Sequence, residues 1–240
     1  GLPHNFGSSS AYPVDSIRSK TFTKKFGIAP SIMDYARFNY IAQPGDEGVE
    51  LVIDVGPYDK YSTMWGYKPI LNKTAEEEKV ILNKWITERA DDLMFRFGSS
   101  SIDPSSQTED LGNDAIKASN YGIANLKRIV PNLIEWTTED GENYEELQYL
   151  YGQVLSQFRR YLGHVSTNVG GVYQYYKTSD QVGAVYTHVE KSHQKNCIKF
   201  LNKNLFETPT WMIDKNILDK IQFAGAVDQV RGLQSSYLNR

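Results

Sequence analysis

Apolar residues recur at steps of three and four through most of the chain after residue 74, and this periodicity constrains the fold more than any other feature. Such spacing places apolar side chains on one face of a helix, and that face must pack against a neighbour. Thr74 followed by Glu77 is a capping box, which predicts the start of a helix running to about residue 97. Further helices are predicted over 108–131, 143–169, 190–205 and 214–223. The sequence therefore predicts a mainly α fold containing a helical bundle.

Two interruptions divide this helical pattern. Residues 98–107 are rich in Gly, Ser, Asp and Pro and are expected to form a linker. Aromatic and β-branched residues between 172 and 189 flank the turn-forming stretch 178–183, which predicts one β-hairpin. Ala115, Ala118 and Gly122 share one helical stripe, and their small size would let a second helix approach closely.

Residues 1–73 have a different character. They hold six of the nine prolines, and short extended or helical pieces alternate with turns. Residues 49–55 suit either a short strand or an irregular loop, and residues 58–67 suit a short helix. We therefore expect two domains, 1–73 and a helical C-terminal domain over 74–240.

Composition excludes several classes of function. The net charge is -3, without a basic stripe, so the chain has no electrostatic footprint for a nucleic-acid partner. Its apolar runs fall far short of the roughly 20 residues needed to span a bilayer, so no membrane span is predicted. Cys197 is the only cysteine, which excludes an internal disulfide and a multi-cysteine zinc site.

The first residues match the end of a zinc-binding motif. A catalytic zinc ion usually takes three protein ligands, and in HExxHxxGxxH the glycine lets the chain turn back so that the third histidine completes the set. Gly1 and His4 match the closing Gly-x-x-His. Taken alone, the tetrapeptide favours a surface histidine near a chain end over a zinc ligand, so a second element is required.

That second element is a methionine turn downstream. Ser31, Met33, Asp34 and Tyr35 form the string Ser-Ile-Met-Asp-Tyr. It is similar to the Ser-x-Met-x-Tyr turn of astacin-like and serralysin-like metzincins, in which the methionine lies below the zinc ligands and the tyrosine reaches the zinc or the oxyanion. The alternative is that Met33 fills a core and Tyr35 bonds to backbone.

A wider resemblance covers most of the chain. A Tyr58-Asp59 pair and a Trp65-Gly66 pair bracket a segment similar to the helix that closes the metzincin C-terminal subdomain. The strings 4–10, 29–40, 43–46 and 107–112 resemble a bacterial Met-zincin family of large zinc-dependent metalloproteases that carry domains of unknown function. This resemblance implies that 1–73 is the C-terminal part of a metzincin-like catalytic domain, with zinc as cofactor, His4 as third ligand, Gly1 as motif glycine and Tyr35 as catalytic residue.

The resemblance also implies a function. The parent protein is expected to hydrolyse peptide bonds in a peptide or protein substrate with a zinc-activated water, and to supply HExxH from an N-terminal catalytic subdomain ahead of Gly1. Since these 240 residues contain no HExxH, the chain alone is expected to be inactive and to bind no zinc. The resemblance suggests an extracytoplasmic location. A competing hypothesis is a non-enzymatic helical binding module, and a weaker metal candidate is His188 with Glu190 and His193.

Overall fold

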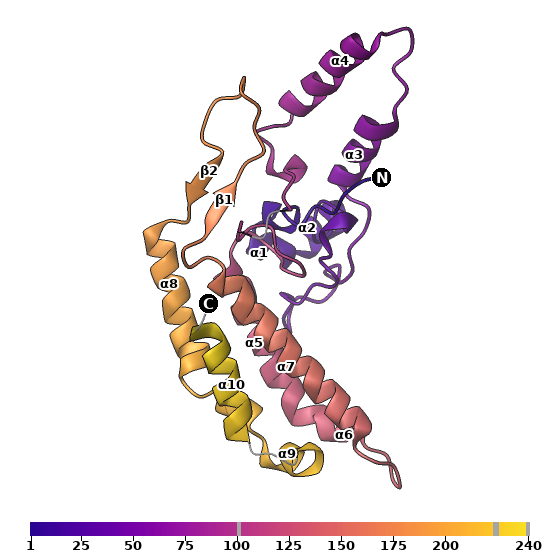
Figure 1. Ribbon diagram of the computed structural model, residues 1–240. Coiled ribbons are helices and arrows are strands. Elements are labelled where there is room, and N and C mark those ends of the chain that lie inside the picture. Colours follow the sequence, from indigo (N-terminus) through magenta and orange to yellow (C-terminus); the bar gives the residue numbers. More distant parts are fainter. Residues whose placement is uncertain (100–101, 223–225, 239–240) are drawn as a thin grey trace. The chain divides into compact units, whose positions relative to one another are not determined.

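The computed structural model describes residues 1–99, 102–222 and 226–238, and it is mainly helical as predicted (Figure 1). The chain forms two compact units. Unit 1 comprises Gly1–Ala118 and Gly171–His188, and unit 2 comprises Ser119–Gly170 and Val189–Arg240. The domain boundary predicted between residues 73 and 74 falls inside unit 1. It stays a prediction of where the metzincin-like catalytic domain ends. Among the described residues, no helix is both long and apolar enough to cross a membrane.

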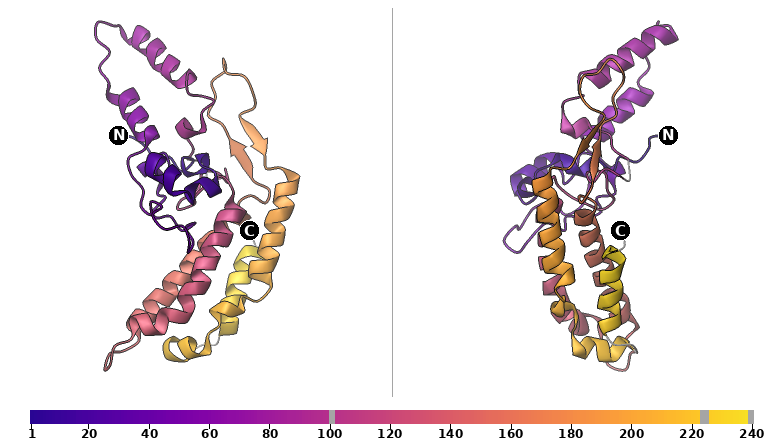
Figure 2. Two further views of the ribbon diagram at one scale, coloured as in Figure 1. Left: turned by 180° about the vertical axis from the view of Figure 1, so that it is seen from behind. Right: turned by 60° about the vertical axis from the view of Figure 1, so that its left-hand side comes forward.

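Unit 1 combines short helices with one hairpin (Figure 2). Its helices are α1 (Val14–Ile17), α2 (Lys20–Phe26), α3 (Pro57–Tyr67), α4 (Ala75–Thr87) and the 3₁₀ turns Ser9–Ala11, Ile32–Asp34 and Leu93–Phe95. The helix predicted over 58–67 is thus confirmed as α3. Its core contains fully buried side chains from α1 and from the segments that connect the helices, namely Ile17, Ile28, Ile41 and Leu111.

Helix α4 begins where the capping box predicted and ends earlier than expected. The Thr74 hydroxyl accepts from the Glu77 amide at 3.3 Å, and the Glu77 carboxylate accepts from the Thr74 amide at 3.0 Å. The helix stops at Thr87, so the prediction of a helix to residue 97 is wrong. Asp92 instead accepts from the Met94 amide at 3.0 Å and starts a separate 3₁₀ turn. An aspartate that bonds to nearby backbone competes with helix continuation.

The predicted hairpin is present as β1 (Val172–Gln174) and β2 (Tyr186–His188), which pair antiparallel with Val172 opposite His188. One buried carboxylate anchors it to the rest of unit 1. Asp103 accepts from the Gln174 amide at 2.9 Å and from the Arg96 guanidinium at 2.6 Å. Residues 49–55 form a loop, and Val52 bridges to Phe38.

Unit 2 is built from helices. They are the part of α5 (Ala115–Ile129) from Ser119 onward, α6 (Leu133–Thr137), α7 (Glu145–Ser166), α8 (Lys191–Leu201), a π-helical turn (Asn202–Phe206), α9 (Lys215–Ile221) and α10 (Ala226–Leu238). The prediction of a helix over 108–131 is corrected to α5, because residues 108–114 form turns. Helices α6 and α10 were not predicted. Residues 100 and 101 of the predicted linker, and residue 223 of the helix predicted over 214–223, lie outside the described residues.

The close helix approach expected at the small residues occurs at Gly122 of α5. A Cβ atom there would lie 2.6 Å from the Tyr161 ring of α7. The Ser119 hydroxyl donates to the Tyr161 carbonyl at 3.1 Å in the same buried contact. Gly122 therefore allows α5 to pack directly on α7.

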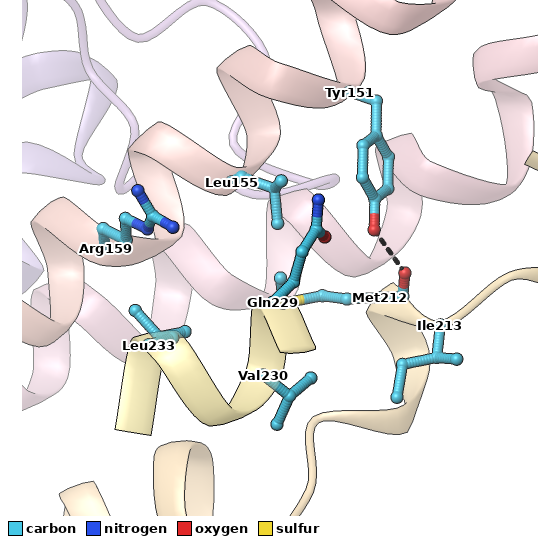
Figure 3. Close-up of a pocket in the computed structure, with 8 residues that line it drawn as sticks. All are labelled: Tyr151, Leu155, Arg159, Met212, Ile213, Gln229, Val230 and Leu233. Carbon is cyan, nitrogen blue, oxygen red and sulfur yellow. Dashed lines mark hydrogen bonds between the residues drawn. The ribbon is translucent and has the colours of Figure 1, made fainter. Parts of the chain in front are cut away.

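A mostly apolar pocket lies elsewhere in unit 2, between α7, the 3₁₀ turn Thr210–Met212 and α10 (Figure 3). Arg159 and Gln229 also line it, and the Tyr151 hydroxyl donates a hydrogen bond of 2.7 Å to the Met212 carbonyl. Leu155 and Val230 contribute to the apolar lining. The side chains predicted for the functional site belong to unit 1, and none of them lines this pocket.

Candidate functional site

The two residues that the sequence predicted for chemistry lie beside each other. The ring centroids of His4 and Tyr35 are 4.7 Å apart, and both side chains are exposed. Phe6 completes an aromatic cluster, with its ring centroid 5.5 Å from His4 and 6.0 Å from Tyr35. An exposed imidazole and an exposed phenol thus share one surface of unit 1.

The backbone ties the histidine segment to the methionine turn. The Asn5 amide donates to the Met33 carbonyl at 2.9 Å, directly after His4 in the chain. Met33 itself is half-buried. Gly1 is exposed and lies against the Tyr67 phenol at the end of α3, where an added Cβ atom would be 2.7 Å from the hydroxyl oxygen.

The methionine turn is a capped 3₁₀ helix. The Ser31 hydroxyl accepts from the Met33 amide at 3.1 Å and starts the turn Ile32–Asp34. Tyr35 ends it in the left-handed conformation, with φ of 67°. That conformation is uncommon for a bulky residue and typical of functional turns. Here it accompanies a phenol that is 45% exposed beside His4.

One carboxylate holds this turn to α3. Asp59 accepts from the Ser31 hydroxyl at 2.6 Å and from the Ile32 amide at 3.0 Å. The same carboxylate accepts from the Gly56 amide at 2.8 Å, which caps α3. The sequence placed Asp59 only at the start of a metzincin-like helix, so its bonds to the methionine turn were not predicted.

The approach of α3 to the methionine turn requires glycine at one position. A Cβ atom on Gly56 would lie 1.9 Å from the Pro30 carbonyl oxygen. The Tyr58 amide also donates to that oxygen at 3.1 Å. Backbone therefore packs on backbone at this point, and no side chain fits between the two segments.

Asp34, next to the exposed Tyr35 in the chain, has a buried side chain. It is fully buried, and its Oδ2 atom accepts from the Ser9 amide at 2.6 Å. The Ser9 hydroxyl donates in turn to Asp110 at 3.1 Å. Burial and the neighbouring Asp110 charge raise the pKa of Asp34 well above its usual range, and burial raises the pKa of Asp110 to about 8. This buried pair, which the sequence did not reveal, links the methionine turn to residue 110.

The donor set fits a zinc ion only in part. An exposed imidazole is a suitable zinc ligand, but a catalytic site needs about three protein ligands. Over the residues that the structure describes, no group of three or more His, Cys, Asp or Glu side chains could hold a metal ion. His4 therefore does not form a complete site with the described residues, and neither do His188 and His193.

Comparison with known families agrees with the sequence resemblance. The whole chain, residues 1–240, matches the model of the family DUF4953, described as Met-zincin. Searches among curated proteins and among solved structures gave no match. The family implies a domain related to zinc metallopeptidases, with zinc in the parent proteins and peptides as the substrate class. The chain belongs to the Met-zincin family DUF4953.

Proposed function

We propose that these 240 residues supply the third zinc ligand, His4, and the methionine-turn wall of a peptidase site. The other two ligand histidines and the general-base glutamate come from an HExxH segment ahead of Gly1 in a longer polypeptide. The observation that carries this proposal is the placement of His4 against Tyr35, with ring centroids 4.7 Å apart. His4 and Tyr35 are distant in sequence, yet they lie side by side. A Gly-x-x-His segment and a methionine turn must be adjacent in this way to serve one zinc site.

Each of the two side chains has a role that its exposure permits. The His4 imidazole offers a nitrogen lone pair to a metal ion on the surface of unit 1. The Tyr35 phenol offers a hydrogen bond to the oxyanion that forms when a peptide carbonyl is attacked. Zinc in a complete ligand set supplies a water of low pKa as the attacking group.

Two consequences belong to the same proposal. The chain alone is inactive, because it contains no HExxH glutamate to accept a proton from the attacking water. The parent enzyme is an endopeptidase that acts outside the cytoplasm on peptides or proteins. Ser31, Met33, Asp34 and Asp59 position the wall and do not touch substrate.

The experiment compares the 240-residue chain with a longer chain that includes the residues encoded ahead of Gly1. We expect the longer chain to bind zinc with about one ion per chain and to cleave a denatured protein substrate in a zinc-dependent manner. Substitution His4→Ala removes both properties, whereas the control His188→Ala, at another exposed histidine, retains them.

Two results would contradict the proposal. One is an upstream sequence without HExxH. The other is a longer chain whose zinc content and cleavage are unchanged by His4→Ala. Either result would favour the helical binding module as the function of this chain.

A further inference from the structure

Asn5, the residue next to His4, is fully buried even though its side chain is polar. Its amide is paired at both ends. The Nδ2 atom donates to the Arg96 carbonyl at 2.9 Å, and the Oδ1 atom accepts from the Gly98 amide at 2.9 Å. A buried amide is costly unless it is hydrogen-bonded, so bonds at both its nitrogen and its oxygen indicate a site built around this side chain.

The main chain around Asn5 makes further bonds to the same segments. The Asn5 amide donates to the Met33 carbonyl at 2.9 Å, and the Gly7 amide donates to the Gly98 carbonyl at 3.0 Å. The segment that carries His4 is therefore hydrogen-bonded both to the methionine turn and to residues 96–98.

Residues 96–98 are themselves fixed. The Arg96 guanidinium bonds to Asp103 at 2.6 Å, and the Asp103 side chain is 1% exposed. Gly98 permits close packing, because a Cβ atom there would lie 2.2 Å from the Ser106 hydroxyl and 3.1 Å from the Gly7 Cα atom. The support for the His4 segment thus comes from residues that follow α4.

We propose that Asn5 is the positioning residue for His4, and that residues 96–98, braced by Asp103, hold the imidazole beside Tyr35. The residues after α4 then serve the candidate site directly, rather than forming only a separate helical module. The effect of Asn5 on zinc binding rests on the proposed function. The placement of the His4 ring by Asn5 does not, and it can be tested on the metal-free chain.

The test uses Asn5→Ala with Asn39→Ala as matched control. Asn39 is another buried amide of unit 1, 4% exposed, and it donates to the Ile17 and Glu50 carbonyls at 3.1 Å each. Each substitution deletes two hydrogen bonds of an asparagine side chain, so the two variants should lower the urea midpoint of unfolding by comparable amounts. The distinguishing measurement is the nuclear Overhauser contact between the His4 and Tyr35 rings.

We expect Asn5→Ala to abolish that contact and to move the His4 ring shifts toward those of an unstructured peptide. Asn39→Ala should leave both unchanged. Asn5→Asp keeps an acceptor for Gly98 but sets a second oxygen against the Arg96 carbonyl, so it should weaken the contact partially. If Asn5→Ala does not fold, the Asn5→Asp chain decides the question.

The proposal is overturned if a folded Asn5 variant keeps the ring contact at wild-type strength, or if Asn5→Ala and Asn39→Ala lose it equally. In the longer, zinc-binding chain, Asn5→Ala should weaken zinc affinity by about 10- to 100-fold, as for other groups that orient a ligand. A longer wild-type chain that binds no zinc would refute the proposed function and leave the positioning result intact.

Discussion

The hydrogen bonds of Asp59 allow a quantitative prediction for Asp59→Ala. The substitution removes the acceptor for the Ser31 hydroxyl and for the Ile32 and Gly56 amides. A hydrogen bond to a charged group contributes about 1.5–3 kcal/mol. Asp59 is 8% exposed, so water can reach its donors only in part after truncation. We therefore expect a loss of about 3–5 kcal/mol in the free energy of unfolding, below the sum of the bonds because such terms are not additive.

The assay is urea unfolding followed by circular dichroism, combined with amide hydrogen exchange over residues 30–35. Asp54→Ala is the control, because Asp54 is exposed and its carboxylate accepts from the adjacent Val55 amide. The control should change stability by less than about 0.5 kcal/mol. Asp59→Asn keeps one acceptor oxygen and should fall between the two. A loss below about 1 kcal/mol for Asp59→Ala, with unchanged exchange at Ile32, would refute the assigned role.

Two further predictions concern packing and pH. Gly122→Ala should destabilise the chain by about 1–2 kcal/mol, because overpacking against Tyr161 exceeds the gain in helix propensity. Gly152→Ala, where an added Cβ comes within 4 Å of no atom beyond its chain neighbours and its own helix backbone, should instead stabilise the chain by up to about 1 kcal/mol; equal effects of the two substitutions in thermal unfolding would contradict this contrast. Burial raises the pKa of Asp110 to about 8, above its unfolded value of about 3.9. The contribution of this carboxyl group to the free energy of unfolding is therefore fully present below pH ~4 and is lost as pH rises through about 8. Urea midpoints measured from pH 4 to 9 should therefore fall with pH in the wild type and less steeply in Asp110→Asn, and parallel curves would contradict the buried-pair assignment.

The sequence predicted the elements whose signals are local. The capping box of Thr74 and Glu77 and the helix after Pro57 each depend on neighbouring residues, and both are present. The small residue at Gly122 correctly indicated a close helix contact. The pairing of His4 with Tyr35 could be expected only because a known motif relates these distant positions.

What the sequence missed depends on long-range partners. Nothing near Asn5 or Asp110 reveals that their partners are residues 96–98 and Ser9. Helix α4 was overestimated because its apolar spacing continues past Thr87, while the Asp92 side chain starts a new turn. Helix α10 was also missed, although it is no less amphipathic than α3 and α4.

We propose that His4 and the methionine turn form one wall of a metal cavity. Zinc-edge X-ray absorption of the longer, zinc-loaded chain tests this arrangement, since the spectrum reports the number of imidazole ligands. We expect one imidazole fewer in His4→Ala than in the wild type, and an unchanged ligand shell in Asn39→Ala. An identical zinc environment in the wild type and His4→Ala would show that His4 is not a zinc ligand.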